Sequence, residues 1–442
     1  MSAPRTNGQG VSESGASHGG DISKQRSWAQ TLVVLLAIAA AVGVALYTLR
    51  PPEVVPANAP TTEFSAERAM KNLKILAKGP RPVGSQGHAE AQRYILKEIR
   101  ALRLRPRVQT TTAMESFPEG GAAVAARVNN ILVRLQGTSD SQQAVLLSAH
   151  YDSWSGSTPG ASDCGSCAVT LLETMRALKA GPPLKNDVIF LFTDAEERVS
   201  VGAKGFVEDD PWAKDAAMIL NFEGAGSHGP VMVLQTVEQN GAAVDGMLEA
   251  TPHPVADSVL PGMWQLARGG DDMEVYKQNL DAAGLDFIYF TDRSVYHTAR
   301  DNLQTIDPRS VQHEGSYALS LTRHFGDAPF EGLKSPNEVF FTVLPGVTVH
   351  YPETWALPIT IVLALAFLGL VVLGIMGRRL SAGKLVLGAL TSILVLIGAV
   401  AATTLLWMLV EALNPSYKET LVFSTVMTYN GSVYLIALSP AP

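Results

Sequence analysis

Histidine and carboxylate side chains recur between His150 and Glu223, and these residue types can bind a metal ion. Zinc prefers imidazole nitrogen and carboxylate oxygen, and a hydrolytic zinc site keeps one coordination position open for water. Two zinc ions about 3.5 to 4 Å apart would share one carboxylate and take roughly two further ligands each. The chain supplies such ligands in His150, Asp163, Glu197, Glu223 and, after a later apolar run, His297.

Glu196 lies beside a candidate ligand and is not needed as a ligand itself. A carboxylate in that place suits the general base that takes a proton from water. A single carboxylate after a strand is often only a solvated loop residue. Together with two histidines, however, the set favours a catalytic site.

Short apolar runs must position these side chains. Residues 144–147, 188–192 and 218–220 each precede one group of candidates, and such runs are typical of buried parallel strands. In an open α/β sheet, ligands bind at the edge formed by the carboxyl ends of the strands. A helix expected at 164–179 fits a parallel crossover unit. The predicted fold class is therefore α/β, with a mixed, mostly parallel sheet.

Further elements extend this sheet into a domain over residues 61–327, which is large but acceptable for one α/β unit. The last expected strand leads to Tyr296 and His297. Helical spacing occurs at 65–77, 88–102 and 310–325, and strands are expected at 104–111, 130–135, 231–234 and 285–290.

Three apolar stretches are long enough to cross a membrane, namely residues 28–49, 355–376 and 385–410. About twenty residues at roughly 1.5 Å each match a hydrocarbon core of about 30 Å. The first is expected to be an uncleaved anchor, because Arg50-Pro51-Pro52 follows it instead of a small-residue cleavage site. No charged residue lies within the three stretches, which argues against a transporter.

Basic residues favour one orientation of these spans. Lys24 and Arg26 precede the first span, and the loop 377–384 between the second and third contains Arg378, Arg379 and Lys384. Such residues are enriched on the cytoplasmic side. We therefore expect an integral membrane protein with a cytoplasmic N-terminus. Its catalytic domain would be extracytoplasmic, in a periplasmic or extracellular location or in a lumen.

The remaining segments have the composition of tails and linkers. Residues 1–27 are rich in Ser, Gly, Asn and Gln and are expected to form a disordered cytoplasmic tail. Residues 50–60 form a Pro-rich linker, expected to be extended and to lift the domain off the membrane. Residues 328–354 form a second linker. The tail 411–442 is of unknown structure and could be a loop, a hairpin or an incomplete fourth span.

The composition restricts the possible partners. The 442-residue chain has a net charge of −7 and no basic patch suited to nucleic acid. The three apolar stretches make membrane lipid an expected partner.

The only cysteines, Cys164 and Cys167, form a C-x-x-C motif. A structural zinc site would need two further soft ligands, which the chain lacks. The pair is interpreted as small residues at the start of a helix. Because the compartment can be oxidising, a disulfide or a reactive pair beside the site stays open.

The order of the motifs resembles one known family. The motifs are His150-x-Asp152, Gly160-Ala161-x-Asp163, Glu196-Glu197, Asn221-x-Glu223 and Tyr296-His297-Thr298, with support from 80–85, 203–206 and 270–276. They occur in the order and approximate spacing of the M28 zinc aminopeptidases. The resemblance covers about residues 65–327 and is strongest to the membrane-anchored branch, which includes an endoplasmic reticulum metallopeptidase and a vacuolar membrane protease.

This resemblance implies the zinc exopeptidase fold, with helices on both faces of the sheet, two zinc ions per chain and a peptide substrate. One ion would be held by His150, Asp163 and Glu223, and the other by His297, Asp163 and Glu197, so that Asp163 bridges them. Glu196 would be the catalytic base, and Asp152 would orient His150 from behind. Tyr296 occupies the position where some members stabilise the tetrahedral intermediate.

Alternative functions stay open at this point. The metal set serves aminopeptidases and carboxypeptidases alike, and an aminopeptidase is our prediction. A glutaminyl cyclase shares the fold but uses one zinc ion and usually has Trp where this chain has Tyr296. A non-catalytic receptor or scaffold would lack ligands, and none is missing here. The remaining polar candidates are interpreted as surface, satisfied or solvated-turn residues: His88, His228, His253, His313, His324, Arg268, Asp271 and Asp272.

Overall fold

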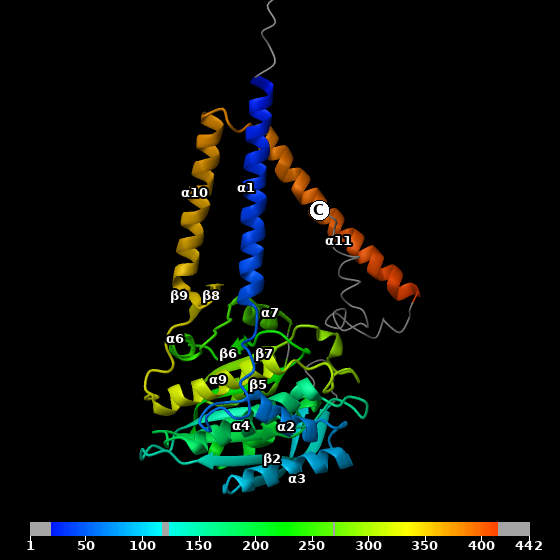
Figure 1. Cartoon of the computed structure of the whole chain (residues 1–442), viewed down its shortest axis with the longest axis vertical. Helices are drawn as coiled ribbons and strands as arrows, with labels where there is room; N and C mark the ends of the chain where they lie inside the picture. Colours follow the sequence, from blue (N-terminus) through cyan, green and yellow to red (C-terminus); the bar gives the residue numbers. More distant parts are fainter. Residues whose placement is uncertain (1–18, 117–122, 268–269, 414–442) are drawn as a thin grey trace, which may run out of the picture. The chain divides into compact units, whose positions relative to one another are not determined.

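The computed structural model describes residues 19–116, 123–267 and 270–413. The chain divides into two compact units, residues 1–48 and residues 49–442. The first unit contains the helix α1 (Gly19–Thr48), and the second contains the α/β domain and two further apolar helices (Figure 1). Residues 1–18 of the predicted disordered tail, Arg268 and residues 414–442 lie outside the described residues.

A seven-stranded sheet forms the centre of the α/β domain, in the order β1-β2-β4-β3-β5-β7-β6. The strands β4, β3, β5 and β7 run parallel to one another, whereas β1, β2 and β6 pair antiparallel. Their bounds are β1 Arg107–Ser116, β2 Ala123–Leu135, β3 Ala144–His150, β4 Asp187–Thr193, β5 Ala216–Gly224, β6 Met232–Thr236 and β7 Ala283–Tyr289. The predicted mixed, mostly parallel sheet is confirmed.

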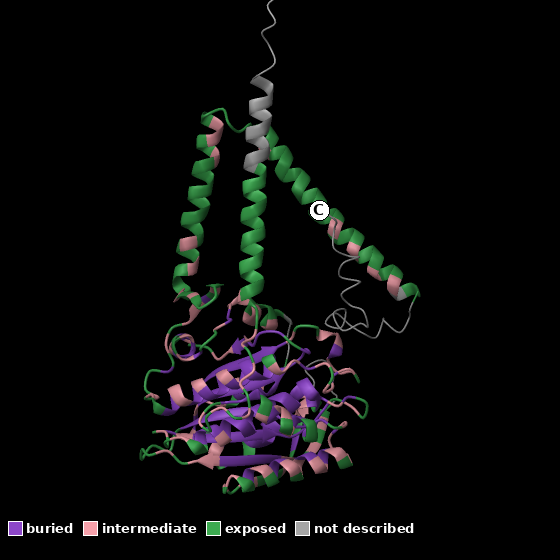
Figure 2. Ribbon diagram, in the orientation of Figure 1, coloured by how far each residue is buried: buried purple, intermediate pink, exposed green. Residues whose placement is uncertain are grey.

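Helices cover both faces of this sheet, because the central strands are apolar on both sides. Along β3, Val145 and Leu147 belong to one buried cluster and Leu146 to another. Figure 2 shows the buried sheet between partly exposed helices. One face is covered by α2 (Ala66–Leu76), α3 (Gln86–Ala101), α4 (Cys167–Ala180), α6 (Gly241–Ala250) and α9 (Pro308–Asp327), and the other by α5 (Val201–Asp209) and α8 (Asp272–Asn279).

The predicted helices and strands are present with shifted ends. Ser65 caps α2 by accepting a hydrogen bond from the Arg68 N–H, and Ser85 caps α3 in the same way. The helices α5, α6, α7 (Val259–Ala267) and α8 were not predicted. Each has at most ten residues, and so short a segment gives little helical periodicity.

The segments predicted to be linkers have more structure than expected. Residues 50–60 are not helical, but the Val55 N–H donates to Gln312 Oε1 on α9 (3.0 Å), and the Ser65 hydroxyl donates to the Val55 carbonyl (2.8 Å). This linker therefore packs on the domain and is not a free spacer. Residues 328–354 include an antiparallel hairpin, β8 (Glu338–Leu344) and β9 (Val347–Pro352).

Three helices of the described chain are long and apolar enough to cross a membrane. The stretches are Thr31–Thr48 within α1, Glu353–Met376 around α10 (Ala356–Met376) and Ala382–Val410 within α11 (Ala382–Leu413). They agree with the three predicted spans. Because α1 begins at Gly19, residues 19–27 are helical, whereas the sequence analysis assigned them to a disordered tail.

Candidate metal centre

The carboxyl edge of the parallel strands brings the predicted residues together. His150 is the last residue of β3, and Glu223 lies near the end of β5. Glu196 and Glu197 begin the short turn 196–198 that follows β4. Asp163 lies in the irregular turn 161–166 before α4, and His297 follows β7 and the turn 293–295.

Asp163 lies between the two histidines. Its Oδ1 atom is 3.2 Å from His150 Nε2, and its Oδ2 atom is 3.2 Å from His297 Nε2. The carboxylate therefore presents one oxygen to each imidazole. This is the arrangement that a carboxylate shared by two metal ions requires.

Each histidine also faces its own glutamate. Glu223 Oε2 is 3.6 Å from His150 Nε2, and Glu197 Oε2 is 3.0 Å from His297 Nε2. Glu196 Oε2 is more distant from His150 Nε2, at 3.9 Å. The side chains thus divide into two groups that share Asp163, with Glu196 beside them.

The chemistry of this cluster fits zinc. His150, Asp163 and Glu197 are buried and can place one ligand atom each within 4.8 Å of one another. Among the described residues, buried polar atoms without a hydrogen-bond partner include Asp163 Oδ2, Glu197 Oε1 and His297 Nε2. Such atoms are costly unless a metal or another partner satisfies them.

The pKa values show how strongly the acids and histidines interact. Burial and the charge of Asp163 raise the pKa of Glu197 to about 7. Burial raises the pKa of Glu196 and of Glu223 well above the usual range. Burial opposes the charge on His297, but the close carboxylates of Asp163 and Glu197 outweigh it and raise the pKa of His297 to about 9. A cation within the cluster would relieve the crowding of carboxylates.

Two residues assigned to supporting roles lie beside the ligands. Asp152 Oδ1 is 3.3 Å from His150 Nδ1, on the side of the imidazole opposite Asp163. It also accepts the Glu196 N–H (3.2 Å), so it contacts both the candidate ligand and the candidate base. The Tyr296 ring stacks on the His297 ring at a centroid distance of 3.7 Å.

Trp154 is part of the site and was missed by the sequence analysis. Its ring stacks on His297 with a centroid distance of 4.1 Å and remains partly exposed. The Arg198 guanidinium lies 5.3 Å from the Trp154 ring centre. An aromatic residue four positions after His150 gives no sequence signal that distinguishes this role from packing.

Asp301 holds the loop that carries Asp163. Its two carboxylate oxygens accept the backbone N–H groups of Ser162 (2.7 Å) and Asp163 (3.1 Å). Asp301 is buried, and burial together with the charge of Asp163 raises its pKa to about 7. Asp301 lies 138 residues after Asp163 in the chain, so local pattern could not reveal this contact.

Arg81 is the second residue that fixes this loop. Its buried guanidinium donates to the carbonyl oxygens of Tyr151 (2.8 Å), Gly160 (2.7 Å) and Pro159. These carbonyls lie in the segment between His150 and Asp163. In the sequence, Arg81 is only one residue of the supporting stretch 80–85, because a basic residue near the N-terminus of the domain gives no sign that it is buried.

Several other polar residues differ from the sequence interpretation. Asp271 and Asp272 are buried, so the predicted solvated turn is wrong. Asp272 accepts a hydrogen bond from the Thr193 hydroxyl (2.5 Å), and Asp271 from the Gln235 amide (2.7 Å). His88 is a satisfied polar residue, as predicted, with Nε2 2.7 Å from Asp194 Oδ1.

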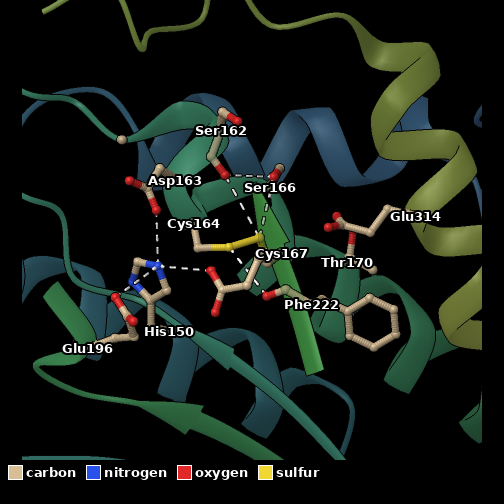
Figure 3. Close-up of a disulfide and its surroundings, with 12 residues drawn as sticks. His150, Ser162, Asp163, Cys164, Ser166, Cys167, Thr170, Glu196, Phe222 and Glu314 are labelled. Carbon is tan, nitrogen blue, oxygen red and sulfur yellow. Dashed lines mark hydrogen bonds and ion pairs between the residues drawn. A yellow bond between two sulfur atoms is a disulfide. The ribbon is translucent and has the colours of Figure 1, made fainter. Parts of the chain in front are cut away.

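Cys164 and Cys167 form a disulfide directly after Asp163 (Figure 3). Both cysteines are buried, and Cys167 begins α4. The sequence left open a disulfide or a reactive pair, and the structure contains the disulfide. The pair is not simply the start of the predicted helix, because Cys164 lies in the irregular turn before α4.

Fold and site together define a class, α/β proteins with a candidate metal centre at the carboxyl edge of the parallel strands. Residues 130–322 match the model of peptidase family M28. The chain is similar to "Endoplasmic reticulum metallopeptidase 1" of Mus musculus, with 30% identity over 66% of this chain and 34% of that protein. It is also similar to "Vacuolar membrane protease" of Schizosaccharomyces japonicus, with 30% identity over 62% of this chain and 33% of that protein.

Among solved structures, the chain is similar to an aminopeptidase from Aneurinibacillus sp. strain AM-1. The identity is 13% and the TM-score is 0.49, over 59% of this chain and 94% of that chain. The present chain spans about a third of the length of the curated relatives it matches.

Proposed function

We propose that the chain is a membrane-anchored di-zinc exopeptidase, specifically an aminopeptidase, whose catalytic domain is extracytoplasmic. The observation that carries the proposal is the position of Asp163, with one carboxylate oxygen toward each histidine and a different glutamate beside each histidine. A single-zinc site would not need a shared carboxylate between two ligand groups.

The residues divide into metal ligands and proton carriers. His150, Asp163 and Glu223 would hold one zinc ion, and His297, Asp163 and Glu197 the other. When bound, zinc supplies the Lewis acidity that polarises a peptide carbonyl and makes water more acidic. Glu196 takes a proton from the attacking water and gives it to the leaving amine. Tyr296 donates a hydrogen bond to the oxygen that becomes negative in the transition state.

The environment of Glu196 supports its role as a base. Burial raises its pKa well above the usual range for a glutamate, which brings it nearer the value that a proton carrier needs at neutral pH. Its backbone N–H is held by Asp152, and the Ser200 hydroxyl donates to its Oε1 atom (3.3 Å). These contacts keep the carboxylate near His150 while it remains outside the ligand groups.

The decisive experiment compares the purified full chain with the Glu196→Gln variant. Zinc per chain is measured by elemental analysis, and hydrolysis is measured on a panel of aminoacyl chromogenic substrates. We expect about two zinc ions in both proteins and a decrease in kcat of about 10²- to 10⁴-fold in the variant. Glu208→Gln, on the exposed face of α5, is the matched control and should retain full activity.

One zinc ion or none, without hydrolysis, would overturn the proposal. Release of ammonia from an N-terminal glutaminyl peptide without peptide cleavage would instead establish a glutaminyl cyclase. Cleavage that requires a free C-terminus would keep the di-zinc chemistry but replace the aminopeptidase with a carboxypeptidase.

A further inference from the structure

The helix α7 presents apolar side chains to the outside of the domain. Val259, Met263 and Leu266 are 66%, 60% and 87% exposed. They recur at helical spacing on one side of α7, and no charged residue occurs from Val259 to Ala267. Scattered apolar residues on a surface need no explanation, but a whole uncharged helical face does.

The hairpin β8–β9 carries a second exposed apolar surface. Val343, Leu344 and Val347 around its turn are 49%, 45% and 49% exposed. Phe341 and Val349 are exposed as well, and no charged residue occurs from Val339 to Val349. An uncharged apolar turn of this kind is a surface that favours contact with an apolar partner.

Hydrogen bonds join the hairpin to the start of α7. The Ser258 N–H donates to the Phe340 carbonyl (2.9 Å), and the Phe340 N–H donates to the Ser258 hydroxyl oxygen (2.9 Å). The Thr342 N–H donates to the Ala256 carbonyl (2.9 Å). We call the exposed apolar side chains of the two elements the docking surface. It consists of Val259, Met263, Leu266, Phe341, Val343, Leu344, Val347 and Val349.

The chain itself indicates what covers this surface. β9 ends at Pro352, and the membrane-compatible stretch begins at the next residue, Glu353. Tyr351 and Trp355 flank that junction, and such aromatic residues are enriched where a span meets the interface. Because the hairpin is continuous with the span, its base must lie at the level of the bilayer surface. An uncharged apolar surface in that place fits lipid.

We propose that α7 and the β8–β9 hairpin dock the catalytic domain onto the bilayer, with the docking surface in the interfacial layer of the lipid. The inner side of α7 gives this contact a functional consequence. Leu260 and Trp264 pack in the cluster that contains Phe290 and Tyr296. α7 is therefore a single layer between lipid and the wall of the metal centre that Tyr296 forms.

The experiment uses single cysteines in the full chain. Met263→Cys on α7 and Val347→Cys on the hairpin are labelled with an environment-sensitive fluorescent maleimide, since Cys164 and Cys167 are joined in a buried disulfide and do not compete. Lys97→Cys, on an exposed position of α3, is the control. Each protein is placed at one copy per phosphatidylcholine nanodisc, with and without lipids that carry a quencher near the headgroup.

We expect blue-shifted emission and quenching by the modified lipid at positions 263 and 347, and neither effect at position 97. If position 263 is not quenched, the proposal is overturned for α7, whatever the hairpin shows. A blue shift without quenching means that a segment of this chain covers the surface, which also overturns it. Quenching that appears only with two copies per disc assigns the surface to a dimer instead.

A variant that folds poorly is identified by a lowered midpoint of thermal unfolding in detergent, and Leu266→Cys then replaces Met263→Cys. The inference rests on the membrane span at α10 and not on the peptidase chemistry. A chain that docks without hydrolysing peptides would therefore refute the proposed function alone, and a chain that hydrolyses peptides without docking would refute this inference alone.

Discussion

Asp163 depends on residues that are distant in the sequence. Asp301 accepts the N–H groups of Ser162 and Asp163, and Arg81 binds carbonyls of the segment before Asp163. Groups that orient metal ligands in this way typically change metal affinity or activity by about 10- to 100-fold when they are altered. At the scale of single residues, the geometry of the site is therefore set as much by these two side chains as by the ligands.

The variant Asp301→Asn tests this dependence. The amide retains one acceptor but turns an NH₂ group toward a backbone N–H, so the loop that carries Asp163 should shift. We expect zinc affinity to fall by about 10- to 100-fold, with activity restored in large part by excess zinc. Competition with a chelator of known affinity measures the change. Asp140→Asn, at an exposed position, is the control, and an unchanged affinity in Asp301→Asn would show that the contact does not position Asp163.

Between elements, the packing of α4 on α9 buries an acid that has no role in the site. Glu314 on α9 is fully buried, and its Oε2 atom accepts a hydrogen bond from the Thr170 hydroxyl on α4 (2.8 Å). Burial raises the pKa of Glu314 from its ordinary 4.5 to about 8. At neutral pH the side chain is therefore neutral in the folded protein and ionised in the unfolded protein.

This difference predicts how stability changes with pH. Because the pKa of Glu314 is raised in the folded state, its contribution to the free energy of unfolding is fully present below pH 4.5. This contribution is lost as the pH rises to about 8. The loss amounts to at most about 5 kcal/mol. Glu314→Gln should remove this pH dependence, so that the midpoint of thermal unfolding falls less between pH 5 and pH 8 in the variant than in wild type. Glu331→Gln, which is exposed, should behave as wild type. Parallel pH curves for wild type and Glu314→Gln would contradict the prediction.

The disulfide joins the turn after Asp163 to the first residue of α4. It closes a short loop, with a sequence separation of 3, so the entropy it removes from the unfolded chain is small and corresponds to about 2 kcal/mol. Because Cys164 is adjacent to Asp163, we expect its larger effect to be on the metal. The double variant with Cys164→Ser and Cys167→Ser should lose a few degrees in thermal midpoint and should bind zinc more weakly. If chelator titrations give the same zinc affinity for the double variant and for wild type, the disulfide only stabilises the fold.

For the whole molecule, the main question is which side of the membrane the catalytic domain occupies. The described chain contains three helices that can span a membrane, and basic residues lie before the first and between the other two. The bias of such residues predicts a cytoplasmic N-terminus and a cytoplasmic loop 377–384. The domain between the first two spans would then be on the opposite side.

Cysteine labelling of intact cells tests this topology. Ser381→Cys in the loop 377–384 should react with a membrane-impermeant maleimide only after the cells are permeabilised. Lys97→Cys in the domain should react in intact cells when the chain is in the surface membrane. Labelling of Ser381→Cys in intact cells would reverse the predicted orientation. The native cysteines give a low background, because both are in the disulfide.

The sequence was sufficient to predict the parallel strands, the three apolar helices and the group of side chains at the strand ends. These features are encoded locally: a buried strand is a short apolar run, a span is a long one, and the candidate site residues lie at the ends of strands or in the loops that follow them. Whether His150, Asp163 and His297 lie close together depends on the order of the strands. The structure gives this order, with β4, β3, β5 and β7 paired in parallel. Their roles as ligands stay a prediction until metal is measured.

Only the tertiary structure could decide which residues support the site and which surface faces outward. Asp301 and Asp163 are 138 residues apart, Arg81 and Gly160 are 79 apart, and Ser258 and Phe340 are 82 apart. Contacts of this kind arise when the layers of the fold pack together, and no periodic pattern in the sequence indicates them. The amino-acid sequence by itself therefore determined the chemistry available and the elements that carry it. The packing determined how Asp163 is held, where the disulfide forms, and that α7 and the hairpin make one apolar surface.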